Sequence, residues 1–256
     1  MPFRAKLFFE IVNDGYLPFN YHHPLMGWIY SAICRRNPKL ATALHDEMKI
    51  KPFTYSDLWG KNNGIDKKKG FFYRKGAKLR FIFSSWDDEI LSSFLNGIIL
   101  DDSVEIADFE IRLVAVKTYQ RTFENDCEKF VLLSPLILSV PVKRGEKLYH
   151  QYVSPLDGLF QEVFVKNLSK KYRRVLGREP APVYVTPDES YVSRKRTSKL
   201  IDIKGTRIRG HIFPFKLCGD PDVIAFGYYA GFGERTAQGF GCVEVCTHDR
   251  EGLRVE

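Results

Sequence analysis

Hydrophobic and polar residues alternate over residues 3–12, and apolar residues then recur at helical spacing from Leu25 to Ile33. This pattern predicts a strand followed by a helix. Asn37-Pro38 has the form of a helix end followed by a new start, with Asn37 as the cap and Pro38 at the first helical position. The further elements expected in this part of the chain are a helix over 39–48, strands over 51–59 and 70–84, a helix over 86–100 and a strand over 104–119. The order is therefore β, α, β, β, α, β.

The rest of the chain shows the same order of elements without a residue-level repeat. Its expected elements are a strand over 130–142, a helix over 156–176, a hairpin pair from 183–193 and 200–217, a short helix over 221–229 and a strand over 241–247. The order βαββαβ is that of the ferredoxin-like unit, which the RNA recognition motif also uses. The polar stretch 120–129 suits a boundary. The predicted fold class is α+β with two tandem ferredoxin-like domains, residues 1–124 and 125–256.

Composition places the chain among ordinary globular proteins, with 44% hydrophobic and 27% charged residues in 256. These values exclude disorder, collagen and coiled coil. The net charge of +8 favours a polyanionic partner. The five cysteines are scattered without a CxxC pair, which argues against a disulfide framework and a zinc knuckle and favours a reducing cytoplasm. No apolar run is long enough for a membrane span.

Four glycines fall within eleven residues between an expected helix and an expected strand. Such a loop can bring backbone N–H groups close to a phosphate, or it can serve only as a helix end and a tight strand entry, and composition favours the two equally. The order of elements and the missing lysine disfavour a nucleotide cofactor. The candidate RNA-binding residues of this loop are Gly231, Gly233, Arg235, Gly239 and Gly241.

Residues 190–216 carry eight cations against one acid, Asp202. This charge predicts a phosphate-binding hairpin, for which the alternative is a solvated surface kept soluble by charge. The RNA-binding candidates here are Arg194, Lys195, Arg196 and Lys199. A second basic cluster, over 67–80, contains aromatic residues that could stack on bases, although on a strand such residues more often belong to the core.

The sequence contains no HExxH motif, acidic cluster or paired cysteine ligands for a catalytic metal. RNA can be cut without metal when the 2′-hydroxyl attacks the adjacent phosphate, which requires a base, a proton donor and a cation. Histidine, tyrosine and lysine supply these groups. His45 is expected at the end of the second helix, where the helix dipole, Asp46 and Glu47 favour its protonated form. Lys51 follows six residues later.

Several stretches resemble the CRISPR-associated endoribonucleases that process repeat RNA. They are Tyr21 to Ile33, Asn37 to Ala41, Leu44-His45, Phe53 to Ser56, Gly70 to Tyr73, Leu133 to Pro135 and the glycine-rich loop. The resemblance implies two tandem ferredoxin-like domains and metal-independent cleavage within each repeat of a precursor transcript, leaving a 2′,3′-cyclic phosphate and a 5′-hydroxyl. It implies no cofactor.

The family's catalytic tyrosine, histidine and lysine match Tyr30, His45 and Lys51 of this sequence. The resemblance implies that His45 is a general base or acid, that Lys51 stabilises the charged phosphorane, and that Tyr30 orients the ribose or donates to the leaving oxygen. The structural alternatives are a buried-face aromatic for Tyr30 and a surface lysine for Lys51. The expected partner is CRISPR repeat RNA, with effector-complex subunits as a further possibility, for a monomer or homodimer. The rival hypothesis is a noncatalytic RNA-binding subunit of such a complex.

Overall fold

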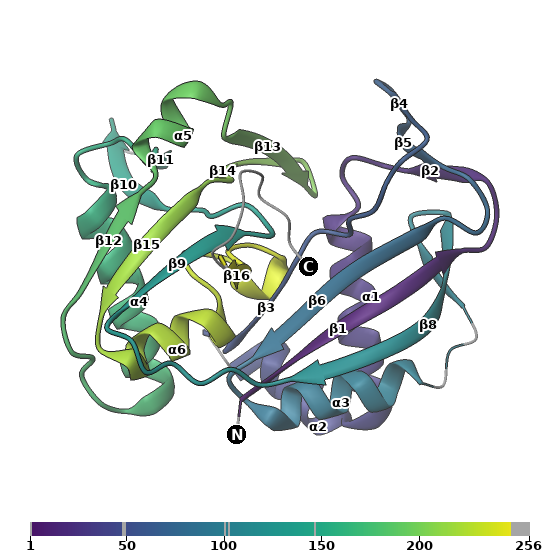
Figure 1. Ribbon diagram of the computed structural model, residues 1–256, viewed down its shortest axis with the longest axis horizontal. Helices are drawn as coiled ribbons and strands as arrows, with labels where there is room; N and C mark the ends of the chain where they lie inside the picture. The colour runs from purple at the N-terminus through teal and green to yellow at the C-terminus, as the bar shows by residue number, and fades with distance from the viewer. Residues whose placement is uncertain (1, 48–49, 100, 102, 146, 247–256) are drawn as a thin grey trace.

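The computed structural model describes residues 2–47, 50–99, 101, 103–145 and 147–246, and its two halves lie side by side (Figure 1). The elements of the N-terminal half are β1 (Phe3–Ile11), β2 (Gly15–Leu17), α1 (His22–Arg36), α2 (Pro38–Thr42), a π-helical turn (Ala43–Glu47), β3 (Phe53–Tyr55), β4 (Gly64–Asp66), β5 (Gly70–Tyr73), β6 (Lys78–Ser85), α3 (Asp88–Ile98), β7 (Val104–Ile106) and β8 (Phe109–Tyr119).

The C-terminal half starts after a short connection. Its elements are β9 (Cys127–Leu132), β10 (Ser139–Arg144), β11 (Lys147–Tyr152), α4 (Phe160–Leu176), β12 (Val183–Pro187), α5 (Glu189–Arg194), β13 (Ser198–Ile203), β14 (Thr206–His211), β15 (Pro214–Gly219), α6 (Pro221–Ala230), a 3-10 turn (Thr236–Gln238) and β16 (Val243–Val245).

Both halves are built on the same sheet topology. The strands are ordered β3-β6-β1-β8-β7 in the first main sheet and β12-β15-β9-β16 in the second. When the four strands of the βαββαβ unit are numbered along the chain, each sheet has the order second, third, first, fourth, with antiparallel neighbours. This is the split βαβ arrangement of the ferredoxin-like fold. The predicted fold class is confirmed.

We call the βαββαβ unit of each half its frame. Three small sheets are inserted into these frames: β2-β5-β4 in the first half, and the hairpins β10-β11 and β13-β14 in the second. In Figure 1 the β2-β5-β4 sheet projects from the right-hand half, and the β13-β14 hairpin crosses the top of the other half toward it.

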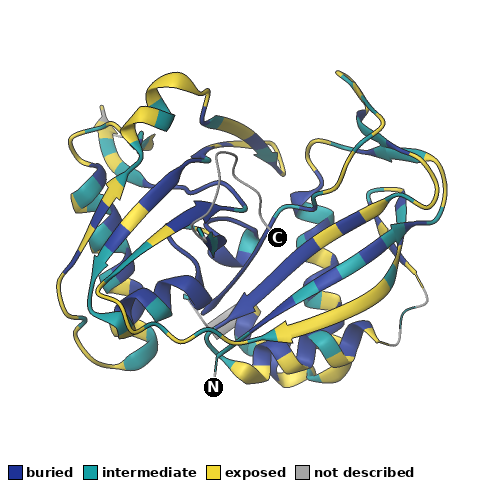
Figure 2. Cartoon of the chain, in the orientation of Figure 1, coloured by how far each residue is buried: buried dark blue, intermediate teal, exposed yellow. Residues whose placement is uncertain are grey.

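Local sequence explains the frame elements. Leu7, Phe9 and Ile11 of β1 are fully buried on one face of the strand, as the alternating pattern predicts. Figure 2 shows the central strands β1 and β6 largely buried. The side chain of Asn37 accepts a hydrogen bond from the Leu40 N–H at 3.0 Å and caps α2, as expected.

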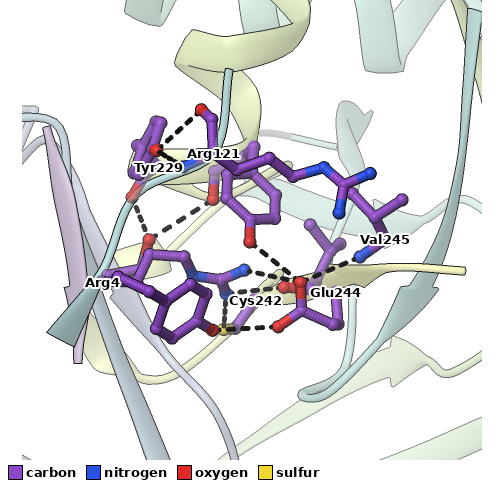
Figure 3. Close-up of polar contacts among 10 residues, drawn as sticks. Arg4, Arg121, Tyr229, Cys242, Glu244 and Val245 are labelled. Carbon is purple, nitrogen blue, oxygen red and sulfur yellow. Dashed lines mark hydrogen bonds and ion pairs between the residues drawn. The ribbon is translucent and has the colours of Figure 1, made fainter. Parts of the chain in front are cut away.

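A buried polar network joins the two halves (Figure 3). Arg4 of β1 is fully buried and donates to the Val243 carbonyl oxygen at 2.6 Å, and its Nη1 atom lies 3.5 Å from the Glu244 carboxylate of β16. That carboxylate accepts hydrogen bonds from the hydroxyls of Tyr119 at 3.0 Å and Tyr228 at 2.8 Å. The guanidinium carbon of Arg4 lies 4.0 Å from the centroid of the Tyr228 ring. The buried positive charge of Arg4 is thus paired with the Glu244 carboxylate across the interface between the two halves.

Cys127 and Cys218 form a disulfide, which corrects the expectation from cysteine spacing. The two residues are paired in register on β9 and β15, with their Cα atoms 4.0 Å apart and a sequence separation of 91. Strand register brought them together, and sequence spacing carries no signal of it. Cys34, Cys242 and Cys246 are free thiols.

The expected pairing of 183–193 with 200–217 is wrong in detail. β12 pairs with β15, and α5 and the separate β13-β14 hairpin lie between them in sequence. The hairpin folds on itself because Ile201, Ile203 and Ile208 bury their side chains in a cluster with Ile137 and Phe240. Likewise the strand expected over 130–142 is two strands, β9 and β10.

Candidate functional site

Tyr30 and Lys51 lie next to each other. Tyr30 is in the middle of α1, and Lys51 is two residues before β3. The Lys51 Nζ atom is 6.0 Å from the centroid of the Tyr30 ring, which in turn lies 6.2 Å from the ring of Phe53. Both side chains are half-buried. The structure therefore brings two of the three predicted catalytic residues together.

Burial changes the acidity of both groups. It raises the pKa of Tyr30 to about 12, so the phenol remains a hydrogen-bond donor at neutral pH. It lowers the pKa of Lys51, because a half-buried ammonium is less well solvated than an exposed one. The pair thus offers an O–H donor beside a cation whose proton is held less tightly than usual.

His45 lies in the π-helical turn that follows α2, and its side chain is exposed. Its place at the end of the second helical segment agrees with the prediction. The Asp46 and Glu47 side chains, expected to favour protonated His45, lie outside the described residues, as do residues 48 and 49, which lead to Lys51. Turns of π-helix are frequent at functional sites. The catalytic role of His45 stays a prediction.

The glycine-rich loop joins the two halves of the molecule. The Thr54 hydroxyl of β3 donates to the Phe240 carbonyl oxygen at 2.9 Å. The Ser134 hydroxyl donates to the Tyr55 carbonyl oxygen at 3.1 Å and accepts from the Cys242 N–H at 3.0 Å. The loop is therefore fixed against the strand that follows Lys51.

Close packing accounts for the four glycines without any ligand. All four are buried and have positive φ. A Cβ at Gly231 would lie 2.7 Å from Thr54 Cβ, and one at Gly239 would collide with the Tyr55 ring. Of the five loop residues predicted to bind RNA, Arg235 alone is exposed. The interpretation of the loop as a tight structural connection thus explains Gly231, Gly233, Gly239 and Gly241.

The cations predicted to bind RNA next to the hairpin are on the surface. Arg194 ends α5, and its Nε donates to the Ser190 carbonyl oxygen at 2.8 Å. Lys195, Arg196 and Lys199 are exposed at the start of the hairpin. Three further exposed cations follow on the β13-β14 hairpin, namely Lys204, Arg207 and Arg209.

Sequence reasoning missed a contact between His22 and Asp57. The His22 Nε2 atom lies 3.0 Å from Asp57 Oδ1, and the ring of His22 stacks against those of Tyr21 and Phe240, with centroids 4.9 and 5.7 Å away. The imidazole therefore joins the start of α1 to the segment after β3 and to the glycine-rich loop. His22 begins α1, and its separation of 35 positions from Asp57 conceals the contact in the sequence.

Lys171 lies on α4 and faces the interior of the protein. It is buried, and its ammonium donates to the Gly231 carbonyl oxygen. Burial lowers its pKa to about 7. Lys171 therefore supports the start of the glycine-rich loop from inside the protein.

The described residues hold no group of three or more histidine, cysteine or acidic residues positioned to bind a metal ion. None of their helices is both long and apolar enough to cross a bilayer.

Comparison with known proteins gave consistent matches along the chain. Residues 16–117 match the family model for the N-terminal part of CRISPR-associated protein Cas6, and residues 117–245 match the model for the Cas6 C-terminal part. A CRISPR-associated endoribonuclease Cas6 of Pyrococcus furiosus is 31% identical over 90% of this chain and 83% of its own length. One from Methanocaldococcus jannaschii is 28% identical over 94% of this chain and 91% of its own.

Solved structures agree with the fold. The product of a Cas6-related gene from Pyrococcus furiosus superposes with a TM-score of 0.87 at 24% identity, covering 97% of this chain and all of that one. A structure described as CRISPR associated protein Cas6 superposes with a TM-score of 0.81 at 26% identity, covering 96% of this chain and all of that one.

Proposed function

The chain belongs to the Cas6 family of CRISPR-associated proteins, and we propose that it is a metal-independent endoribonuclease that cleaves CRISPR repeat RNA in the precursor transcript. Two relatives that match over more than four-fifths of their length are named endoribonucleases. The observation that carries the proposal is the approach of Lys51 to Tyr30, because it pairs a cation with a protonated phenol beside β3.

The proposed reaction is attack by a ribose 2′-oxygen on the adjacent phosphorus. A bond forms between that oxygen and phosphorus, and the bond to the 5′-oxygen of the next nucleotide breaks, leaving a 2′,3′-cyclic phosphate and a 5′-hydroxyl. One group must remove the 2′-hydroxyl proton, another must protonate the leaving oxygen, and a cation must stabilise the added charge on the phosphorane.

The chain supplies a group for each task. His45 removes or delivers a proton, Lys51 faces the charged phosphorane oxygens, and Tyr30 donates its phenolic hydrogen to the leaving oxygen or orients the ribose. The raised pKa of Tyr30 supports a donor role for it. Exposed cations at Arg194, Lys195, Arg196, Lys199 and Arg235 would hold the phosphate backbone, which positions RNA without selecting its sequence.

The test is cleavage of the source organism's repeat RNA in EDTA. Cutting should persist in the chelator and should stop when a 2′-deoxynucleotide precedes the scissile phosphate. His45→Ala should slow cutting by about 10² to 10⁴-fold with little change in RNA affinity, whereas His150→Ala, which removes another exposed histidine, should not. Tyr30→Phe removes the hydroxyl and keeps the ring, so it tests the contribution of the hydroxyl alone. Binding without cutting by the unmodified protein would favour the noncatalytic hypothesis.

A further inference from the structure

The small sheet β2-β5-β4 carries an aromatic pair on the face turned away from the core. Tyr16 and Phe72 are paired in register, with their ring centroids 5.1 Å apart at an interplanar angle of 46°. Their strand neighbours Leu17 and Tyr73 point to the other face and are buried. Tyr16 and Phe72 are half-buried and belong to none of the hydrophobic clusters of the described residues. Core packing therefore does not account for these two rings.

A fixed turn places cations against the pair. The Lys69 Nζ atom lies 5.2 Å from the centroid of the Tyr16 ring. The Asp66 carboxylate accepts hydrogen bonds from the backbone N–H groups of Lys68 at 2.8 Å and Lys69 at 2.9 Å, which holds the turn between β4 and β5 in one shape. The side chains of both lysines are exposed. Positive charge is thus presented beside an aromatic surface.

The space beside Phe72 is open. Gly64 of β4 is the register partner of Phe72 on the side opposite Tyr16, and a Cβ built at Gly64 would meet no atom within 4 Å. A glycine opposite an aromatic residue on an outward face leaves the edge of the ring uncovered. The backbone of Gly64 does not need glycine for its conformation, because its φ is not positive.

The aromatic pair lies near the basic hairpin. Asn20, which follows β2 closely in sequence, accepts a hydrogen bond through Oδ1 from the Asp202 N–H of the β13-β14 hairpin at 3.3 Å. Figure 1 shows this hairpin and the β2-β5-β4 sheet both along the top of the view. Arg207 and Arg209 of the hairpin are exposed. Cations therefore occur on both elements that meet here.

We propose that Tyr16 and Phe72, together with Lys69, form a stacking site for the bases of an unpaired RNA segment. Aromatic rings beside cations bind single strands by stacking on bases while the cations neutralise phosphates. The elements that carry this site differ from those that carry Tyr30 and Lys51, so it would bind RNA outside the scissile linkage. The inference rests on the proposed function only in taking RNA as the substrate.

The test measures affinity for a fluorescein-labelled repeat RNA that a 2′-deoxynucleotide at the scissile position makes uncleavable. Phe72→Ala should weaken binding between about 5-fold and about 150-fold, the range for losing one stacked base. Gly64→Ile removes no group but fills the open space beside Phe72, and it should weaken binding in the same direction. Phe19→Ala is the matched control, because Phe19 packs edge-on against Phe71 on the other face of the same sheet, with centroids 5.0 Å apart. It should leave affinity within about twofold.

Abasic substitutions identify the stacked base. One abasic position should weaken binding to the unmodified protein and have no further effect on Phe72→Ala, with melting curves showing that the variants are folded. Unchanged affinity in both Phe72→Ala and Gly64→Ile would overturn the proposal. An equal loss of binding to a fully paired RNA or to anionic phospholipid vesicles would also overturn it, because the site would then recognise charge alone. Failure of the unmodified protein to cut repeat RNA would remove the proposed function, whereas these binding comparisons would still decide the stacking site.

Discussion

Removing the disulfide between Cys127 and Cys218 should lower the stability of the folded chain by a predictable amount. The bond closes a loop with a sequence separation of 91 residues. The chain-entropy relation for a loop of that length gives about 4.6 kcal/mol at 25 °C, through restriction of the unfolded chain. With an unfolding entropy of about 2.1 cal/mol/K per residue, this equals a fall in Tm of roughly 9 °C for cooperative unfolding of the whole chain. Both cysteines are half-exposed, so replacing them with serine adds little loss of packing.

The assay is thermal unfolding by calorimetry of the Cys127→Ser/Cys218→Ser double variant. Cys34→Ser, which removes an exposed free thiol, is the control and should leave Tm unchanged. Reductant should reproduce the fall in the unmodified protein and have no effect on the double variant. Titration of thiols in denaturant should find the three free cysteines without reductant. Five titratable thiols under those conditions, or a Tm that ignores both reductant and the double substitution, would refute the reasoning.

Three further perturbations probe packing and charge. Gly239→Ala should destabilise the folded protein by more than Gly76→Ala does in denaturant titrations. Both positions have positive φ, but only a Cβ at position 239 would collide with a tyrosine ring, that of Tyr55, at an overpacking cost of about 1–3 kcal/mol. Equal losses would show that backbone strain alone matters. Arg4→Met should destabilise the folded protein by about 3–5 kcal/mol, because it leaves the largely buried Glu244 carboxylate without its cation. The added change Glu244→Gln should recover part of the loss in a double-mutant cycle. Purely additive losses would contradict an energetic coupling between the two side chains. Burial holds the pKa of Lys171 at about 7 in the folded protein, below its ordinary value, so above that pH the unfolded chain binds a proton that the folded chain does not. Stability should therefore rise with pH from about 7 to about 10. Urea titrations across this range should show that Lys171→Met flattens the rise, and an unchanged slope would exclude the lysine as its source.

The frame of the protein could be predicted from its sequence because burial leaves a periodic trace. Alternation marked β1, helical spacing marked α1 and α3, and the pair Asn37-Pro38 marked the start of α2. The strand order within each sheet is the one that the βαββαβ unit has in the ferredoxin-like fold. Strand ends and insertions were harder, because short strands such as β4 carry too few residues for a period to be visible.

The candidate site was only partly predictable for a different reason. Tyr30 and Lys51 could be named as candidates because both residue types fit the chemistry and match positions of the family pattern, and the structure places them 6.0 Å apart, from Nζ to ring centroid. The His22–Asp57 contact, the Arg4–Glu244 pair and the disulfide join residues 35, 240 and 91 positions apart. Such pairs depend on how the two halves and their strands come together, which a local pattern cannot express.

The two halves share one sheet topology, so they differ mainly in the small sheets inserted into each frame. The frames meet through β3, the glycine-rich loop and the Arg4 network, where groups are buried and paired. The inserted sheets β2-β5-β4 and β13-β14 instead present exposed lysines and arginines, and the first of them also carries the half-buried rings of Tyr16 and Phe72. Because exposed charges add little to folding stability but can bind polyanions, substitutions of the exposed lysines and arginines in the insertions should change RNA affinity more than Tm. Substitutions where the frames meet should lower Tm. They should also change the rate of cleavage, because they alter the position of β3, the strand that follows Lys51.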